Sequence, residues 1–175
     1  TAKTWAEDLV YGGYDDWRLP KVAPVNGSSF QFVFSNNGST DLGYAKTGAG
    51  GGWGEGSEMA HLFYVTLGNK GICEPNDTLP ESCTYQLGYG PTNKGPFNKW
   101  QPLSGWSSSE YAPDQDYAWV FEAENGVQDI RVKTLTNYAW AVRSGDVAAV
   151  PEPQTYEMLL LGITALTVAA RRRPR

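Results

Sequence analysis

Apolar positions with helical spacing occur first around Trp5. Trp5 and Leu9 lie four residues apart, as two side chains on one face of a helix do. Thr4 is a candidate N-cap, and Glu7 follows it at the position that completes a capping box. The pattern predicts a short amphipathic helix that begins at Thr4 and ends at the glycine pair of residues 12–13.

A second helical pattern covers residues 57–69. Leu62 precedes Val65 by one helical turn, and the glycine and asparagine at residues 68–69 supply a C-cap signal. His61 lies within this mostly apolar segment, where a structural imidazole is expected rather than a general base. We therefore expect a second helix over these residues.

Apolar positions alternate in the second half of the sequence. This alternation predicts four antiparallel strands, over residues 100–106, 117–123, 127–132 and 138–143. The Asn125-Gly126 pair between two of them favours a hairpin with a type I′ turn. A further short strand is expected at residues 30–34, followed by a long loop that extends to Gly56. Helices followed by a sheet indicate an α+β domain.

Composition and charge narrow the classes of protein to consider. The sequence has 20 glycines, 11 prolines, 7 tryptophans and 10 tyrosines, which is unlike a helical bundle and indicates long loops. Residues 1–150 hold 10 of the 14 basic and 17 of the 19 acidic residues, so their net charge is −7. This balance argues against binding to nucleic acid by phosphate neutralisation.

Two short features carry specific structural expectations. Residues 13–20 combine a turn with a Trp-Arg pair and a terminal proline, so we expect Trp17 to be buried and Arg18 to be held by a carboxylate. Cys73 and Cys83 lie in a polar, proline-containing stretch and predict a disulfide that closes a surface loop. A metal site is the alternative for the two cysteines, but two thiols and one histidine are a poor ligand set.

Residues 149–175 differ in pattern from the rest of the chain. Pro151 and Pro153 flank Glu152 and hold the backbone in an extended, polyproline-like conformation. Such a segment cannot join a following helix, so it is available as a recognition site. The sequence therefore predicts two parts, a domain over residues 1–148 and this tail.

An apolar segment and an arginine cluster follow the Pro-Glu-Pro motif. The apolar segment predicts a single hydrophobic helix over residues 155–170, with a length of about 24 Å against a hydrocarbon core of about 30 Å. Arg171, Arg172 and Arg173 are expected to remain cytoplasmic, which places residues 1–150 on the far side of the inner membrane. A plain C-terminal membrane anchor is the alternative.

The order of these three parts, ending in the arginine cluster at residues 171–175, resembles the PEP-CTERM sorting signal of Gram-negative bacteria. That resemblance implies processing by exosortase, a membrane protease-transpeptidase, after a transient stay in the inner membrane. It also implies delivery to the outer surface or to an extracellular matrix rich in exopolysaccharide. Thr1 begins no recognisable secretory signal, so we expect an export region to precede it.

Several motifs occur in a fixed order along residues 3–148: Trp5, 13–20, 57–64, 106–111, Asn125-Gly126 and 141–146. Together they resemble the DUF1566 family, which includes the C-terminal domain of the Legionella collagen-like adhesin. The resemblance implies a C-type-lectin-like or formylglycine-generating-enzyme-like fold, with a twisted antiparallel sheet, two helices and long loops. Such folds usually bind ligands, and the acidic charge favours a neutral glycan or a protein partner over a polyanion.

Several aromatic residues are candidates for ligand binding. Trp53, Trp100 and Trp106 lie in loops rich in glycine, proline and serine, where they either stack on sugar rings or pack a loop-rich core. Tyr111 is a fourth candidate. The sequence thus offers a set of rings for a glycan.

One acidic segment offers oxygen ligands for a metal. Glu110, Asp114 and Asp116 are spaced closely enough to coordinate calcium, although a solvated acidic loop is the simpler interpretation. No other cofactor is expected.

These features favour a non-enzymatic surface or matrix protein that binds glycan or an envelope component, in adhesion or biofilm formation. A structural matrix protein without a specific ligand is one alternative. An oxidase or hydrolase of the formylglycine-enzyme type is another, but the cysteines have no basic neighbour that would activate a thiol.

Overall fold

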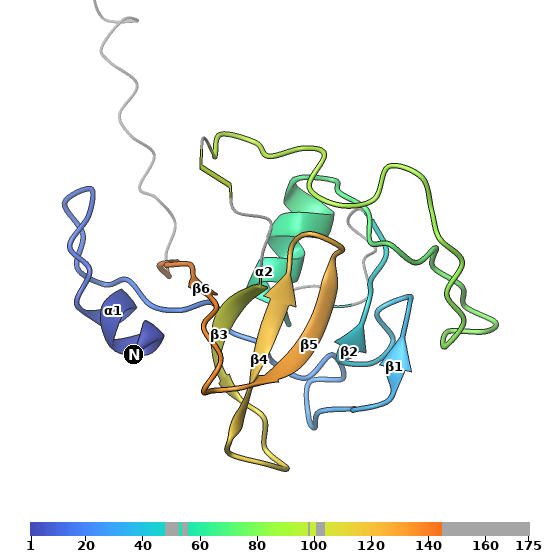
Figure 1. Cartoon of the computed structure of the whole chain (residues 1–175), viewed down its shortest axis with the longest axis horizontal. Coiled ribbons are helices and arrows are strands. Elements are labelled where there is room, and N and C mark those ends of the chain that lie inside the picture. The colour runs from blue at the N-terminus through green and yellow to red at the C-terminus, as the bar shows by residue number, and fades with distance from the viewer. Residues whose placement is uncertain (48–52, 54–55, 98, 101–103, 145–175) are drawn as a thin grey trace, which may run out of the picture. The chain divides into compact units, whose positions relative to one another are not determined.

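A computed structural model describes residues 1–47, 53, 56–97, 99–100 and 104–144 (Figure 1), and the chain divides into two units, Thr1–Arg143 and Ser144–Arg175. The first unit is described here. Its elements in chain order are α1 (Ala2–Glu7), β1 (Phe34–Ser35), β2 (Leu42–Gly43), α2 (Glu58–Ala60), the π-helix η1 (His61–Thr66), β3 (Ser104–Glu110), β4 (Tyr117–Glu122), β5 (Val127–Val132) and β6 (Tyr138–Ala139). The predicted helix at 155–170 lies outside the described residues.

Within the described residues, all strands join in one sheet with the order β1-β2-β5-β4-β3-β6. Its centre is the antiparallel meander β3-β4-β5, and β5 also pairs antiparallel with β2. The two edge strands are parallel to their neighbours, β1 to β2 and β6 to β3. The expectation of an antiparallel strand at residues 138–143 is therefore wrong in direction and length, because alternation reports which side chains share a face but not which strand pairs.

The first strand of the meander begins later than expected. The sequence pattern places a strand at residues 100–106, whereas β3 begins at Ser104 and its register with β4 shifts between Trp106 and Glu110. Serine side chains fix this part of β3 to the early chain, because Ser109 Oγ accepts from the Val22 amide at 3.0 Å and donates to the Val22 carbonyl at 2.7 Å. Polar residues thus occupy a strand that apolar alternation could not reveal.

One face of the sheet packs against η1. Trp119 and Phe121 of β4 point to the same face and are almost fully buried. The ring of Phe63 lies 5.4 Å from that of Phe121, and the Tyr64 hydroxyl donates to the Gly126 carbonyl at 2.8 Å. These contacts fix the helix both to the centre of the sheet and to the β4-β5 hairpin. Figure 1 shows the helical segment behind β4.

The opposite face of the sheet packs against α1 and the segment that follows it. Ala118 and Val120 of β4 are buried together with Trp106, Ala6 and Leu19. Because both faces of β4 are covered, its residues Ala118 to Phe121 are all buried. This double burial explains the nearly continuous apolar run of the strand.

The first helix forms, but with different boundaries and a different buried face. Helix α1 begins after Thr1, whose hydroxyl accepts from the Thr4 amide, and so Thr4 is not the cap. Ala6 is buried, whereas the side chain of Trp5 is 47% exposed. The prediction that Trp5 and Leu9 form the apolar face is therefore wrong, because a six-residue helix is oriented by its small residue packing closely on the sheet.

The helix expected at residues 57–69 is confirmed, with an irregular geometry. Ser57 is its N-cap, and Leu67 donates to the Leu62 carbonyl at 2.9 Å, five residues back, as in a π-helix. Gly68 has a positive φ of 64°, and the Asn69 amide donates to Phe63 O at 3.0 Å. This closure is the glycine C-cap that the sequence predicts.

The hairpin between β4 and β5 is confirmed, but its turn is not of type I′. Glu122 pairs with Val127, so four residues form the connection, and the Gly126 amide donates to the Glu122 carbonyl at 2.8 Å. Gly126 has a φ of 84°, while Asn125 does not have a positive φ. A type I′ turn needs a positive φ at both central residues.

The motif at residues 13–20 is tied to α2 by an ion pair. Arg18 donates to both carboxylate oxygens of Glu58 at 2.7 Å, which confirms the expected carboxylate partner. The Lys21 amide also donates to Glu58, at 2.6 Å. Trp17 is half-buried rather than buried, and its indole N–H donates to the Tyr11 carbonyl at 3.2 Å. The arginine of the pair, and not the tryptophan, fixes the motif to the unit.

Candidate functional site

The aromatic candidates from the sequence do not form one surface. Trp53 is 4% exposed, its indole N–H donates to the Thr40 carbonyl at 2.7 Å, and its ring meets Tyr64 edge to face. Tyr111 is half-buried among other rings, and its ring centroid lies 4.8 Å from that of Phe32. Of the two alternatives for the loop tryptophans, Trp53 follows the packing of a loop-rich core.

Trp100 lies at an aromatic pocket that the sequence does not predict. The pocket has a volume of about 360 Å³ and is lined by Phe97, Lys99, Trp100, Tyr138, Ala139, Trp140 and Ala141. We call the part formed by Phe97, Trp100, Tyr138 and Trp140 the aromatic pocket. Segments before β3 and at β6 contribute to it, so it exists only because β6 pairs with β3.

The rings of the aromatic pocket form a buried base and an exposed rim. Trp100 is 7% exposed, and its ring packs edge to face against the ring of Trp140, with 4.6 Å between the ring centroids. The ring centroid of Phe97 lies 5.6 Å from that of Trp100 and 6.0 Å from that of Trp140. Phe97 and Tyr138 are 39% and 43% exposed. Fixed apolar rings with accessible edges and faces are suited to stacking against the C–H faces of a sugar.

A glycine makes room for the base of this pocket. A Cβ atom at Gly105 in β3 would lie 3.3 Å from Cδ1 of Trp140, tighter than most carbon contacts. Gly105 pairs with Tyr138 of β6, which places the following Trp140 beside the sheet. The glycine therefore allows the tryptophan to lie close to β3.

Polar groups at the aromatic pocket are few. Lys99 is the charged residue of the lining, and its side chain is exposed. The indole N–H of Trp100 is buried and has no hydrogen-bond acceptor in the described part of the chain. Most of the binding energy for a ligand here would come from ring contact, with the lysine amine as a donor at the rim.

Trp106 belongs to a different depression, beside α1. This groove has a volume of about 270 Å³, and Trp106, Leu19 and Ala118 supply its apolar wall. Glu110 and Lys133 line it as an ion pair with a distance of 2.8 Å. Trp106 is 9% exposed and packs in the core, so it offers little ring surface.

The acidic segment is not assembled as a calcium site. The hydrogen bond from Lys133 lowers the pKa of Glu110, and that carboxylate is thus already paired. Asp114 Oδ1 accepts from the Asp116 amide at 3.0 Å and stabilises the turn between β3 and β4. Among the residues that the structure describes, no three His, Cys, Asp or Glu side chains form a metal-binding group. The calcium hypothesis is therefore not supported, because these side chains serve the turn and an ion pair.

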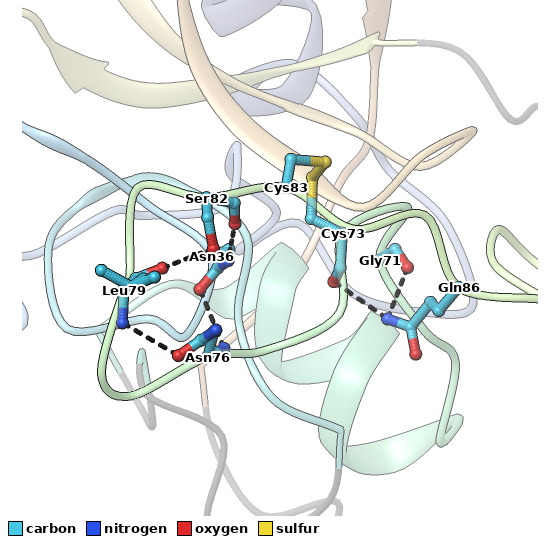
Figure 2. The surroundings of a disulfide bond; sticks show 8 residues. All are labelled: Asn36, Gly71, Cys73, Asn76, Leu79, Ser82, Cys83 and Gln86. Atoms are coloured by element: carbon cyan, nitrogen blue, oxygen red, sulfur yellow. Dashed lines mark hydrogen bonds between the residues drawn. A yellow bond between two sulfur atoms is a disulfide. The ribbon is translucent and has the colours of Figure 1, made fainter.

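The disulfide between Cys73 and Cys83 is confirmed, and Figure 2 shows its surroundings. Asn36, which is fully buried, lies inside the closed loop: its side chain accepts from the Asn76 amide at 3.0 Å and donates to the Ser82 carbonyl. The disulfide therefore fastens the loop around a residue that follows β1. Both cysteines are bonded, so this unit offers no free thiol for a cysteine-based mechanism.

Sequence reasoning missed three of the four residues of the aromatic pocket. The alternation of apolar positions places Tyr138 and Trp140 in a strand, and no local pattern marks Phe97. The available signal was the density of aromatic residues within residues 97–106 and 138–140, although their approach in space depends on the parallel β6-β3 pairing.

Comparison with known proteins gives one finding, and it concerns the tail. Residues 149–173 match the family described as the PEP-CTERM protein-sorting motif. The tail is a PEP-CTERM motif. The match spans Pro151, Glu152 and Pro153 and continues to Arg173, although these residues lie outside the described structure.

The PEP-CTERM motif implies that exosortase sorts this protein to the cell envelope or surface. The chain matches no curated protein and no solved structure. The resemblance of residues 3–148 to DUF1566 is not supported by these comparisons. In the described residues, no helix is both long and apolar enough to span a membrane.

Proposed function

We propose that this protein is a non-enzymatic component of the outer cell surface or extracellular matrix, and that its aromatic pocket binds a glycan. The DUF1566-like, lectin-like character of residues 1–148 is part of the proposal. The observation that carries this proposal is the aromatic lining of the pocket, formed by Phe97, Trp100, Tyr138 and Trp140. The rings of Phe97 and Tyr138 are accessible at its rim. A protein delivered to the outer surface or to the extracellular matrix would also be exposed to extracellular polysaccharide.

The chemistry of the pocket favours ring stacking over catalysis. Its lining has no carboxylate, histidine or cysteine among the described residues, so it lacks the commonest general acid-base groups and a thiol nucleophile. Each ring that contacts a ligand is expected to contribute about 0.5 to 1.5 kcal/mol beyond the burial of its area. Weak contacts of this kind are suited to a polymeric glycan, because many copies of the protein can bind along one polymer chain.

The test is binding of the exported protein to a glycan array and to extracellular polysaccharide from the producing cells, followed by tryptophan fluorescence. Tyr138→Ala and Phe97→Ala should each weaken binding about two- to tenfold. Tyr85→Ala is the matched control, because Tyr85 is 76% exposed and does not line the pocket.

Two results would contradict the proposal. Binding no stronger than background for the wild type would favour a structural matrix protein without a ligand. Equal losses for Tyr138→Ala and Tyr85→Ala would show that general surface aromaticity, rather than the aromatic pocket, attracts the glycan.

A further inference from the structure

Three Asn-x-Ser/Thr triplets occur in the described part of the chain, in different surroundings. They are Asn26-Gly27-Ser28, Asn37-Gly38-Ser39 and Asn76-Asp77-Thr78. This triplet is the acceptor pattern for N-linked glycans in exported proteins, provided that the asparagine is accessible. Because the PEP-CTERM motif implies export, the surroundings of each amide decide which asparagine a glycosyl donor can reach.

Asn26 has the surroundings of an acceptor. Its side chain is exposed, and its Oδ1 accepts from the Ser28 amide at 2.9 Å and from the Ser28 hydroxyl at 3.0 Å. The Ser29 amide donates to the same oxygen at 3.0 Å. The hydrogen bonds of this turn all use Oδ1 of Asn26. The Nδ2 atom of Asn26 makes no hydrogen bond within the residues described.

Asn37 has the same triplet sequence and opposite surroundings. It is 8% exposed, and its Nδ2 donates to Asp77 Oδ1 at 2.9 Å and to the Asn76 carbonyl at 3.4 Å. A glycan on this nitrogen would break the contact with Asp77, which also pairs with Lys46. Asn37 is therefore an internal control that differs from Asn26 in burial but not in triplet sequence.

Asn76 is intermediate between the two. It is half-buried inside the disulfide-closed loop, and its Oδ1 accepts from the Thr78 amide at 2.9 Å. The same oxygen accepts from the Leu79 amide at 2.9 Å (Figure 2). Thr78 is exposed, so the triplet is reachable from one side. Its occupancy is expected to fall between those of Asn26 and Asn37.

We propose that Asn26 is a site of N-linked glycosylation, in addition to the glycan binding proposed above and independent of it. The co-reactant is an activated sugar, a glycosyl ester of phosphate or pyrophosphate, delivered by a glycosyltransferase of the producing cell. Asn26 Nδ2 forms a bond to the anomeric carbon, and the bond from that carbon to the phosphate oxygen breaks. The phosphate leaves with the electron pair, and one amide proton passes to a base of the transferase.

The test begins with the mature protein isolated from its producing cells. Proteolytic peptides are analysed by mass spectrometry with fragmentation that preserves the sugar on its residue. A glycan on the Asn26 peptide, with none on the Asn37 peptide, is the expected result. An unmodified Asn26 peptide, or equal occupancy of Asn26 and Asn37, would overturn the proposal.

Variants separate attachment at Asn26 from attachment at a neighbouring hydroxyl. Asn26→Gln and Ser28→Ala should each abolish the glycan, whereas Ser28→Thr should retain it. Ser29→Ala is the control outside the triplet and should leave occupancy unchanged. A glycan that remains on the peptide containing residue 26 in the Asn26→Gln variant would refute attachment to the Asn26 amide nitrogen.

The source of the activated sugar is distinguished by where transfer takes place. The chain is also produced in the same cells without an export leader, so that it remains in the cytoplasm. Glycosylation of Asn26 in that form assigns a soluble nucleotide sugar as the donor, whereas its restriction to the exported form assigns a lipid-linked donor.

Discussion

At the scale of single residues, the ion pair of Arg18 and Glu58 is the contact that sequence reasoning foresaw in part. Both of its hydrogen bonds have a length of 2.7 Å, and the pair joins the segment after α1 to the start of α2. Burial acts to raise the pKa of Glu58, but the hydrogen bonds from Arg18 and from the Lys21 amide outweigh it and lower the pKa below its ordinary value of 4.5. The carboxylate is therefore bound more tightly in its charged form.

This lowered pKa predicts a pH dependence of folding stability. In the unfolded chain Glu58 takes up a proton near pH 4.5, whereas the folded state resists protonation until lower pH. The stabilisation by Glu58 is thus complete above pH 4.5 and is lost as the pH falls through the lower, folded-state pKa. Glu58→Gln should reduce the free energy of unfolding by about 1 to 3 kcal/mol at neutral pH.

Urea denaturation from neutral pH to well below pH 4.5 measures this effect. The difference between wild type and Glu58→Gln should shrink as the pH falls. Glu81→Gln serves as the control, because Glu81 is exposed and forms no ion pair with any described residue. A difference that stays constant over the whole pH range would contradict the role of the Glu58 charge.

At the scale of elements, local signals were sufficient for the helix at 57–69 and for the existence of the β4-β5 hairpin. They were insufficient for the edge strands. Gly43 in β2 has a φ of 119°, and a Cβ there would collide with the Ser35 carbonyl, so the parallel β1-β2 pairing depends on one glycine. Nothing local in the sequence identifies the partner of that glycine. The aromatic pocket was missed for the same reason, since the β6-β3 pairing that assembles it is non-local.

The disulfide-closed loop gives a second prediction, at the element scale. A closed loop of this length should contribute about 2 to 3 kcal/mol by restricting the unfolded chain. Replacing both Cys73 and Cys83 by serine should lower the free energy of unfolding by that amount. Hydrogen exchange should also accelerate at the Asn76 amide, because its acceptor Asn36 is held inside the loop.

Reduction of the wild type supplies the matched control for this prediction. A reductant should bring the stability of the wild-type protein to that of the Cys73→Ser, Cys83→Ser variant and leave the variant unchanged. If wild type and variant unfold at the same denaturant concentration under oxidising conditions, the loop is stabilised by its hydrogen bonds alone.

At the scale of the whole molecule, the unit Thr1–Arg143 and the sorting motif have separate roles. Within the unit Thr1–Arg143, Arg143 pairs with Asp16 at 2.8 Å and lies 3.5 Å from the centre of the Tyr14 ring, so the last residues of the unit are fastened to its early segment. The destination of the protein is encoded separately, in residues 149–173. A change in one part is therefore expected to leave the other part functional.

This separation predicts the result of changing the Pro-Glu-Pro motif. Replacing Pro151, Glu152 and Pro153 by alanine removes the prolines from which the sequence predicts an extended recognition segment for exosortase. The variant should accumulate in an uncleaved, membrane-retained form, while the folded unit still binds polysaccharide like the wild type.

Mass spectrometry of the surface and membrane fractions measures the processing, and Gln154→Ala, adjacent to the motif, is the control. Equal processing of the triple variant and the control would refute the role of the motif, because exosortase would then not depend on the proline-flanked glutamate.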